Sequence, residues 1–133
     1  MKTLMRSVCI FLFLASPAFA QCIDAKARGS ATIVARIWRG RVPTPRAAEY
    51  AKYLYDNGPV KIRKIARNLG AEMLRRTDGN VTEFVVISYW PDRESIKAFA
   101  GADIEKAHFL PRDREFLIKP DEYVHHYDVT CSP

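Results

Sequence analysis

The chain has 133 residues and a formal net charge of +6, from 21 basic and 15 acidic side chains. This length favours a single domain. Bases and acids are interleaved along the chain, which excludes the concentrated basic surface typical of a nucleic-acid-binding protein. We therefore expect one domain and no nucleic-acid partner.

The first twenty residues have the pattern of a secretory signal peptide. Lys2 and Arg6 give a positive start, residues 8–14 form an apolar run too short to span a membrane, and residues 18–20 form a small-x-small cleavage sequence. We expect cleavage before Gln21, which lowers the net charge from +6 to +4 because two bases leave. The mature protein is then exported to the periplasm or the medium. It has no integral membrane segment, because no second hydrophobic span follows.

Two cysteines, Cys22 and Cys131, remain after Cys9 is removed with the signal peptide. Export places them in an oxidising compartment, where such a pair commonly forms a disulfide. Closing so long a loop stabilises a fold by roughly 4–5 kcal/mol in the chain-entropy model. A structural disulfide is favoured over redox chemistry, because the chain has no Cys-x-x-Cys motif.

Hydrophobic periodicity and turn residues divide the mature chain into strands and helices. Residues 21–30 are polar and predict an irregular lead-in to one domain spanning 31–133. We expect Thr44 and Asp92 to cap helices, Gly101 to end a helix, and residues 40–45, with two prolines, to break the first strand. The predicted strands cover 31–39, 71–76, 81–90 and 123–129, with a short extended piece over 116–118, and the predicted helices cover 45–56, 60–69, 93–100 and 104–110.

The order strand, helix, strand, strand, helix, strand predicts the ferredoxin-like split βαβ fold. This is an α+β arrangement, with helices on one face of an antiparallel sheet. Its central strands are the first and third, and 31–39 and 81–90 are the two that carry apolar side chains on both faces. The last strand lies beside the first, which brings Cys22 and Cys131 to one edge. Because helices cover only one face, a second copy packed sheet on sheet is expected, giving a homodimer.

Four segments together resemble the antibiotic biosynthesis monooxygenase superfamily, the dimeric α+β barrel proteins. They are the strands IVARIWRG and EYVHHYDV, the helix RAAEYAKYL and the strand-helix run TEFVVISYWPDRESIKAFAG. The resemblance covers residues 33–129 and implies the fold, whereas function varies within the superfamily. Members include cofactor-independent monooxygenases acting on polycyclic aromatic substrates, and haem-degrading enzymes.

The haem-degrading branch is similar at one informative place. In that branch a Trp closes the third strand, and a His after two helical pieces ligates the haem iron. Trp90 and His108 stand in a similar arrangement here. That branch also uses an Asn on the first strand, whereas the corresponding residues 35–38 read Ala-Arg-Ile-Trp. This departure argues against haem degradation and leaves haem binding open.

His108 is the strongest candidate for chemistry. It belongs to an otherwise apolar face of the predicted helix 104–110, where a neutral imidazole can act as a base or ligate iron. The alternative is a partly exposed histidine at a helix end, satisfied by backbone groups and the helix dipole. The resemblance to the haem-degrading branch favours the functional interpretation.

Aromatic side chains are candidates for binding a flat ligand. Trp38 and Trp90 can stack on such a ligand, and Tyr50 and Phe99 belong to the same argument. The alternative for each is packing in the core or at a dimer interface.

Arg36 lies in a mostly buried strand, where an unpaired charge is costly. Its partner is expected to be an acid such as Glu83, or else a ligand carboxylate. His125 and His126 are adjacent on a strand and point to opposite faces, so they cannot easily chelate one metal. No zinc-type cluster is predicted.

Three functional hypotheses follow. The first is an exported dimeric protein that oxidises a flat, electron-rich aromatic small molecule with oxygen and without a bound flavin or metal, with His108 as base or orienting group. The second is a periplasmic haem-binding or haem-processing protein with His108 as axial ligand. The third is a non-enzymatic dimer that binds a ligand.

Overall fold

The computed structural model describes residues 32–130. The predicted signal peptide, the lead-in over 21–30, and both cysteines of the predicted disulfide, Cys22 and Cys131, lie outside these residues. Within 32–130, no helix has the length and apolar character needed to cross a membrane. The elements, in chain order, are β1 (Val34–Pro43), the short 3-10 helix η2 (Thr44–Arg46), α1 (Ala47–Asn57), α2 (Pro59–Ile62), β2 (Gly70–Asp78), β3 (Val81–Trp90), α3 (Arg93–Ala100), α4 (Asp113–Phe116) and β4 (His125–Asp128).

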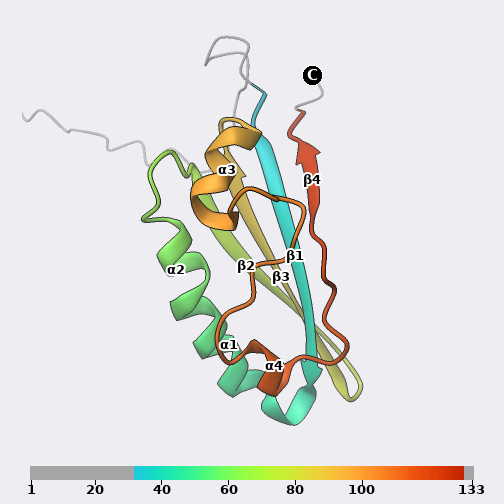
Figure 1. Ribbon diagram of the computed structural model, residues 1–133. Coiled ribbons are helices and arrows are strands. Elements are labelled where there is room, and N and C mark those ends of the chain that lie inside the picture. The colour runs from blue at the N-terminus through green and yellow to red at the C-terminus, as the bar shows by residue number, and fades with distance from the viewer. Residues whose placement is uncertain (1–31, 131–133) are drawn as a thin grey trace, which may run out of the picture.

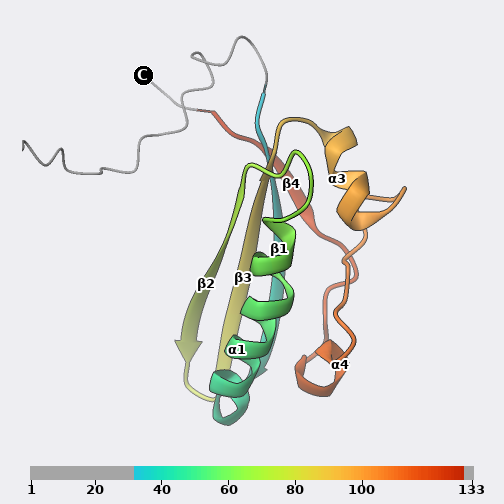
Figure 2. The same cartoon turned by 90° about the vertical axis from the view of Figure 1, so that its left-hand side faces the viewer.

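The four strands form one antiparallel sheet in the order β2-β3-β1-β4. The helices gather on one face of this sheet (Figures 1 and 2). The predicted α+β, ferredoxin-like fold is therefore confirmed, with β1 and β3 in the centre. The β1–β3 ladder is in register over its whole length, from Val34 opposite Trp90 to Pro43 opposite Val81.

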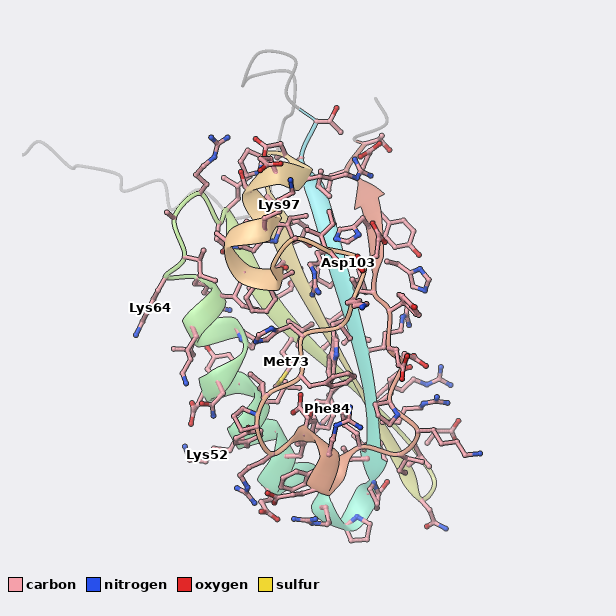
Figure 3. All side chains as sticks on the ribbon, in the orientation of Figure 1. Lys52, Lys64, Met73, Phe84, Lys97 and Asp103 are labelled. Atoms are coloured by element: carbon pink, nitrogen blue, oxygen red, sulfur yellow. The ribbon has the colours of Figure 1, made fainter. Side chains whose placement is uncertain are left out.

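Alternation along β1 and β3 separates the two faces of the sheet. Even-numbered residues of both strands point toward the helices and are buried, as Phe84 illustrates with no exposed surface. Figure 3 shows Phe84 in the interior and Lys52 and Lys64 projecting outward from the helical layer. Odd-numbered residues of β3 are half-buried on the face that no helix covers, except for exposed Val81 at its start.

The first strand is longer than predicted. It continues through Gly40 and ends at Pro43, because the ladder with β3 continues to Val81. Packing requires a glycine at position 40, because a side chain there would collide with the indole of Trp38. A glycine inside a strand pattern often marks such a close approach, and here it does not end the strand.

Three local predictions are confirmed. β3 spans Val81–Trp90, as expected from its apolar run. Asp92 caps α3 by accepting a hydrogen bond from the backbone N–H of Ser95. Gly101 follows α3 with a φ of +81°, a conformation that glycine adopts without strain.

The helix predictions were less accurate. Thr44 makes no side-chain cap and instead donates from its hydroxyl to the Gly79 carbonyl. The helix expected over 60–69 stops at Ile62, and Leu69 is 38% exposed. The helix expected over 104–110 is absent. Its backbone pairs with the chain ahead of β4, through an isolated bridge between Lys106 and Tyr123.

The C-terminal predictions also need correction. Residues 113–116 form α4, and Ile118 and Lys119 lie in a bend, so the extended piece expected over 116–118 was wrong. The last strand covers His125–Asp128 rather than 123–129. Tyr123 lies in the isolated bridge instead, because the segment at 105–107 takes the backbone hydrogen bonds of residues 122 and 124.

Candidate functional site

A pocket lies between the helix-facing side of the sheet and the segments that cover it. It has about 410 Å³ of atom-free space including its mouth, of which the centre of a water molecule can occupy about 30 Å³. That smaller volume holds about one or two waters. The lining is mostly apolar with a few polar groups, and it consists of Arg36, Trp38, Leu54, Gly58, Ile62, Val86, Ser88, Phe99, His108, Leu110 and Asp113.

Arg36 brings a buried cation to this pocket. Its side chain leaves the helix-facing side of β1, and the residue is only 3% exposed. Its Nη2 donates to the Lys106 carbonyl oxygen at 2.8 Å, and its guanidinium lies 5.3 Å from the centre of the Phe99 ring. Burial lowers the pKa of Arg36 to about 10, so it stays charged at neutral pH. The expected partner Glu83 lies on the opposite face of the sheet, so that pairing was wrong.

Phe99 connects the aromatic groups of the site. Its ring stacks on Trp90 at a centroid distance of 6.5 Å and lies 5.0 Å from the imidazole of His108. Trp90 itself is fully buried, does not line the pocket, and donates its indole N–H to Ser88 Oγ at 2.9 Å. Trp90 therefore supports Phe99 from behind, and Phe99 and His108 face the pocket.

His108 lies on an irregular segment rather than on a helix. Flanking backbone groups hold it in place: the Ala107 N–H donates to the Glu122 carbonyl, and the Leu110 N–H donates to Asp113 Oδ2 at 2.7 Å. The side chain of His108 is exposed at the mouth of the pocket. No hydrogen bond within residues 32–130 fixes its imidazole.

A buried carboxylate also lines the pocket. Asp113 is 1% exposed, and its Oδ1 accepts a hydrogen bond from the Tyr50 hydroxyl at 3.0 Å. Burial raises the pKa of Asp113, although the hydrogen bonds from Leu110 and Tyr50 and the proximity of His108 oppose that rise. Tyr50 is fully buried behind Asp113 and does not line the pocket.

Four of the six residues predicted for the site meet at this pocket, namely Arg36, Trp38, Phe99 and His108. Trp90 and Tyr50 lie one layer behind it. Sequence reasoning missed Ser88 and Asp113. The alternation of β3 puts Ser88 on the same face as Phe84 and Trp90, and that signal was available, whereas nothing local indicated that Asp113 would be buried.

A second polar group lies next to Arg36 on the neighbouring strand. His126 pairs with Arg36 across the β1–β4 ladder, and its side chain is 3% exposed. Its Nδ1 lies 3.3 Å from Glu105 Oε1 without hydrogen-bond geometry. His125 is exposed, so the two histidines point to opposite faces as expected.

Comparison with known proteins identifies solved structures with a similar fold. No family model matches the sequence, and no curated protein matches it. A protein of unknown function from Nitrosomonas europaea has a similar solved structure, with a TM-score of 0.57, 14% identity, and coverage of 79% of this chain and 96% of that one. A putative antibiotic biosynthesis monooxygenase from Bacillus cereus gives a TM-score of 0.54, 14% identity, and coverage of 77% and 97%.

A monooxygenase from Streptomyces coelicolor, solved in complex with nanaomycin D, is similar with a TM-score of 0.50 and 20% identity, covering 77% of this chain and 91% of that one. Identities this low show the fold alone. The chain has the fold of the antibiotic biosynthesis monooxygenases, as the resemblance in its sequence implied.

Proposed function

We propose that this protein oxidises a flat, electron-rich aromatic molecule with molecular oxygen, without a bound flavin or metal. The observation that carries the proposal is the convergence of Trp38, Phe99, Arg36 and His108 on one largely apolar pocket. Apolar walls with a few polar groups are typical of small-molecule sites. The S. coelicolor monooxygenase of similar fold binds nanaomycin D, which supports a ligand of this kind.

The chemistry requires a base. It also requires a substrate that supplies all the electrons that reduce oxygen, because no cofactor takes part. A phenol with hydrogen on its para carbon meets this requirement, because phenol and oxygen give a quinone and water. His108 accepts the hydroxyl proton, and the para carbon of the phenolate bonds to one oxygen atom after electron transfer to oxygen. The distal peroxide oxygen takes back the proton that His108 accepted, and loss of the proton on the para carbon then breaks the O–O bond, which leaves a carbonyl on the ring and releases hydroxide. The released hydroxide takes up a proton and leaves as water.

Ligand entry requires the pocket to widen. The centre of a water molecule can occupy only about 30 Å³ of it, which is room for about one or two waters and not for a bicyclic ring system. His108 is exposed and no hydrogen bond within residues 32–130 engages its imidazole, so we infer that binding turns this side chain away from Phe99 and Trp38 while the anchored backbone stays in place. Such a change is possible only if the ligand binds the open form more tightly than the closed form. Contact between the ring of the ligand and the aromatic walls provides this difference in affinity.

Oxygen uptake tests this proposal. Purified mature protein is supplied with 1-naphthol and anthrone, and oxygen consumption is compared with quinone formation. His108→Gln should slow the reaction by about 10²–10⁴-fold if the imidazole is the general base. His125→Gln is the matched control, because His125 is exposed on the other face of the sheet. Equal uptake by the His108 and His125 variants would contradict the assignment of the base.

Haem binding is the second candidate, and His108 is the feature that favours it. An exposed imidazole at a pocket mouth can ligate iron. The pocket as it stands does not fit a porphyrin, because the space open to water centres has room for only about one or two waters. A haem titration followed by absorbance, with His108→Ala alongside, separates the two candidates. A saturable shift at one haem per chain that the variant loses would favour haem.

We also propose a homodimer formed by the uncovered face of the sheet. Leu74 and Tyr127 on this face are 49% and 51% exposed, and the β3 residues Val85 and Ile87 are half-buried beside them. Exposed apolar side chains on an uncovered sheet face often mark a contact with a partner. Light scattering on the mature protein should give twice the chain mass. Leu74→Lys should lower that mass, whereas Leu69→Lys, on the segment between α2 and β2, should leave it unchanged.

Export and the disulfide are part of the same proposal. They rest on the composition of residues 1–20 and on Cys22 and Cys131. N-terminal sequencing of the secreted protein should begin at Gln21. Alkylation before and after reduction should label the two cysteines only after reduction, and labelling without reduction would contradict the disulfide.

A further inference from the structure

Two residues that line the pocket each have a buried hydrogen-bond donor without a partner. The donors are Nε of Arg36 and Nε1 of Trp38, and within residues 32–130 neither atom finds an acceptor. Both residues line the pocket, and they are 3% and 7% exposed. Buried donors in native proteins nearly always have an acceptor. Two such donors on residues that line one pocket therefore indicate that the pocket's ligand supplies the acceptors.

The charge around Arg36 makes the expected acceptor anionic. Its one hydrogen bond goes to a neutral group, the Lys106 carbonyl oxygen. Glu105, the acid whose charge acts on Arg36, has a side chain 59% exposed and lies against His126. Asp113 also lines the pocket, but its two oxygens already accept hydrogen bonds from Tyr50 and Leu110. A buried guanidinium with no buried counter-ion favours an anion beside it.

The shape of the wall restricts that anion to a group on an apolar ring. Phe99 lies against the guanidinium, and Trp38 is two residues along the same face of β1. A planar guanidinium matches a planar carboxylate better than it matches a spherical ion. Residues i and i+2 of a strand, here Arg36 and Trp38, lie about 7 Å apart along the backbone. The Trp38 donor therefore meets a second acceptor at another edge of the ligand's ring system.

We propose that the pocket selects flat aromatic carboxylates, with the carboxylate on Nε of Arg36 and a keto or hydroxyl oxygen on Nε1 of Trp38. This inference rests on the proposed function only in placing the ligand in the same pocket. It adds the substrate class, and it assigns Arg36 as the residue that determines specificity. Residues 35–38 lack the Asn of the haem-degrading branch, and in this proposal Arg36 of the same segment binds the carboxylate of the ligand.

Calorimetric titration of the mature protein with a matched pair of probes tests the inference. The pair is 2-naphthoate and 2-naphthamide, which share a ring and differ in charge. Wild-type protein should bind the acid about tenfold or more tightly than the amide, because a hydrogen bond to a charged group is worth more than a neutral one. Arg36→Met keeps the length of the side chain without its charge and should remove the preference. Arg39→Met, an exposed arginine of the same strand, should keep it.

Equal affinity of the wild-type protein for acid and amide, or no binding of either at millimolar concentration, would overturn the inference without any variant. A preference for the acid that survives in Arg36→Met would overturn it as well. Oxygen uptake with 1-naphthol and with 5-hydroxy-2-naphthoate, a phenol that also carries a carboxylate, is measured on the same samples and keeps the two proposals apart. Uptake without acid preference refutes the carboxylate site alone. Acid preference that depends on Arg36, without uptake from any phenol, supports the carboxylate site and refutes the monooxygenase.

Discussion

Gly40 offers a sharp test of how the central strand positions the pocket wall. An alanine Cβ at this position would meet Leu117 Cδ2 at 2.8 Å and Trp38 Cζ2 at 2.9 Å, and would lie closer still to Trp38 Cη2. The indole is 7% exposed and packed in the core. The ring must therefore shift, and since Trp38 lines the pocket, the wall moves with it.

The expected cost of Gly40→Ala follows from this overlap. Forcing one methyl group into a packed core costs about 1–3 kcal/mol. For a domain of this size each kcal/mol lowers the melting temperature by roughly 4–8 °C. Urea unfolding followed by far-UV circular dichroism gives the free energy of unfolding directly, and the slope should stay unchanged because the unfolded chain is hardly altered.

A double-mutant cycle decides whether the indole is responsible. Trp38→Phe removes the distant ring atoms that the new methyl group would meet, so Gly40→Ala should cost about 1 kcal/mol less in that background. Gly79→Ala is the control for glycine replacement without crowding, because nothing lies within 4 Å of a Cβ there and only its φ of +55° opposes the change. If Gly40→Ala costs the same with and without the indole, the crowding argument is refuted.

Three further predictions concern buried polar groups. Tyr50→Phe removes the donor to Asp113 and should lower the free energy of unfolding by about 1.5–3 kcal/mol, measured by urea unfolding. Ser88→Ala leaves the indole N–H of Trp90 without an acceptor and should cost about 1–3 kcal/mol, whereas Ser88→Ala combined with Trp90→Phe should cost less than the sum of the two single changes. Burial lowers the pKa of His126, so its contribution to stability is present above pH 6.5 and is lost as the pH falls; His126→Leu should flatten that loss in melting scans from pH 7.5 to 5.

Each of these predictions has an outcome that contradicts it. An unchanged free energy of unfolding in Tyr50→Phe would mean that water replaces the lost hydroxyl. Strict additivity of the Ser88 and Trp90 changes would mean that the two groups do not interact. His125 is exposed, so His125→Leu is the control for the pH dependence. If His125→Leu flattens the loss of stability at low pH as much as His126→Leu does, burial of His126 is not its cause.

The fold was predictable because its signals are local and agree with one another. The cap at Asp92 and the two-sided apolar run of β3 each depend on neighbouring residues. The helix over 104–110 was wrongly predicted because its periodicity is real but too short to outweigh long-range pairing. The backbone at Glu105 and Ala107 gains hydrogen bonds from residues 122 and 124 that an isolated helix of seven residues would not match.

The site was predictable only in part, for a physical reason. Arg36, Trp38 and Phe99 follow from strand alternation and from one helical face, which sequence shows. Asp113 depends on Tyr50, a residue 63 positions away, and its burial is a property of the packed chain. For Trp90 the position was predictable but the direction of the side chain was not. It lies at the end of β3 as expected, yet its ring turns into the core and donates a hydrogen bond to Ser88.

The chemistry at His108 depends on a backbone that distant residues hold. Arg36 fixes the Lys106 carbonyl, and Asp113 fixes the Leu110 N–H, so the residues on both sides of His108 are anchored to buried side chains of opposite charge. The imidazole between them is left free, since no hydrogen bond within residues 32–130 engages it. A base must be held near its proton and still be able to accept it, and an anchored backbone with a free ring meets both conditions. Arg36 therefore serves the site twice in this proposal, because the same guanidinium that holds the segment also has an Nε without a partner and belongs to a residue that lines the pocket. A ligand carboxylate bound there would lie beside the anchor of His108, which couples recognition of the substrate to the position of the base.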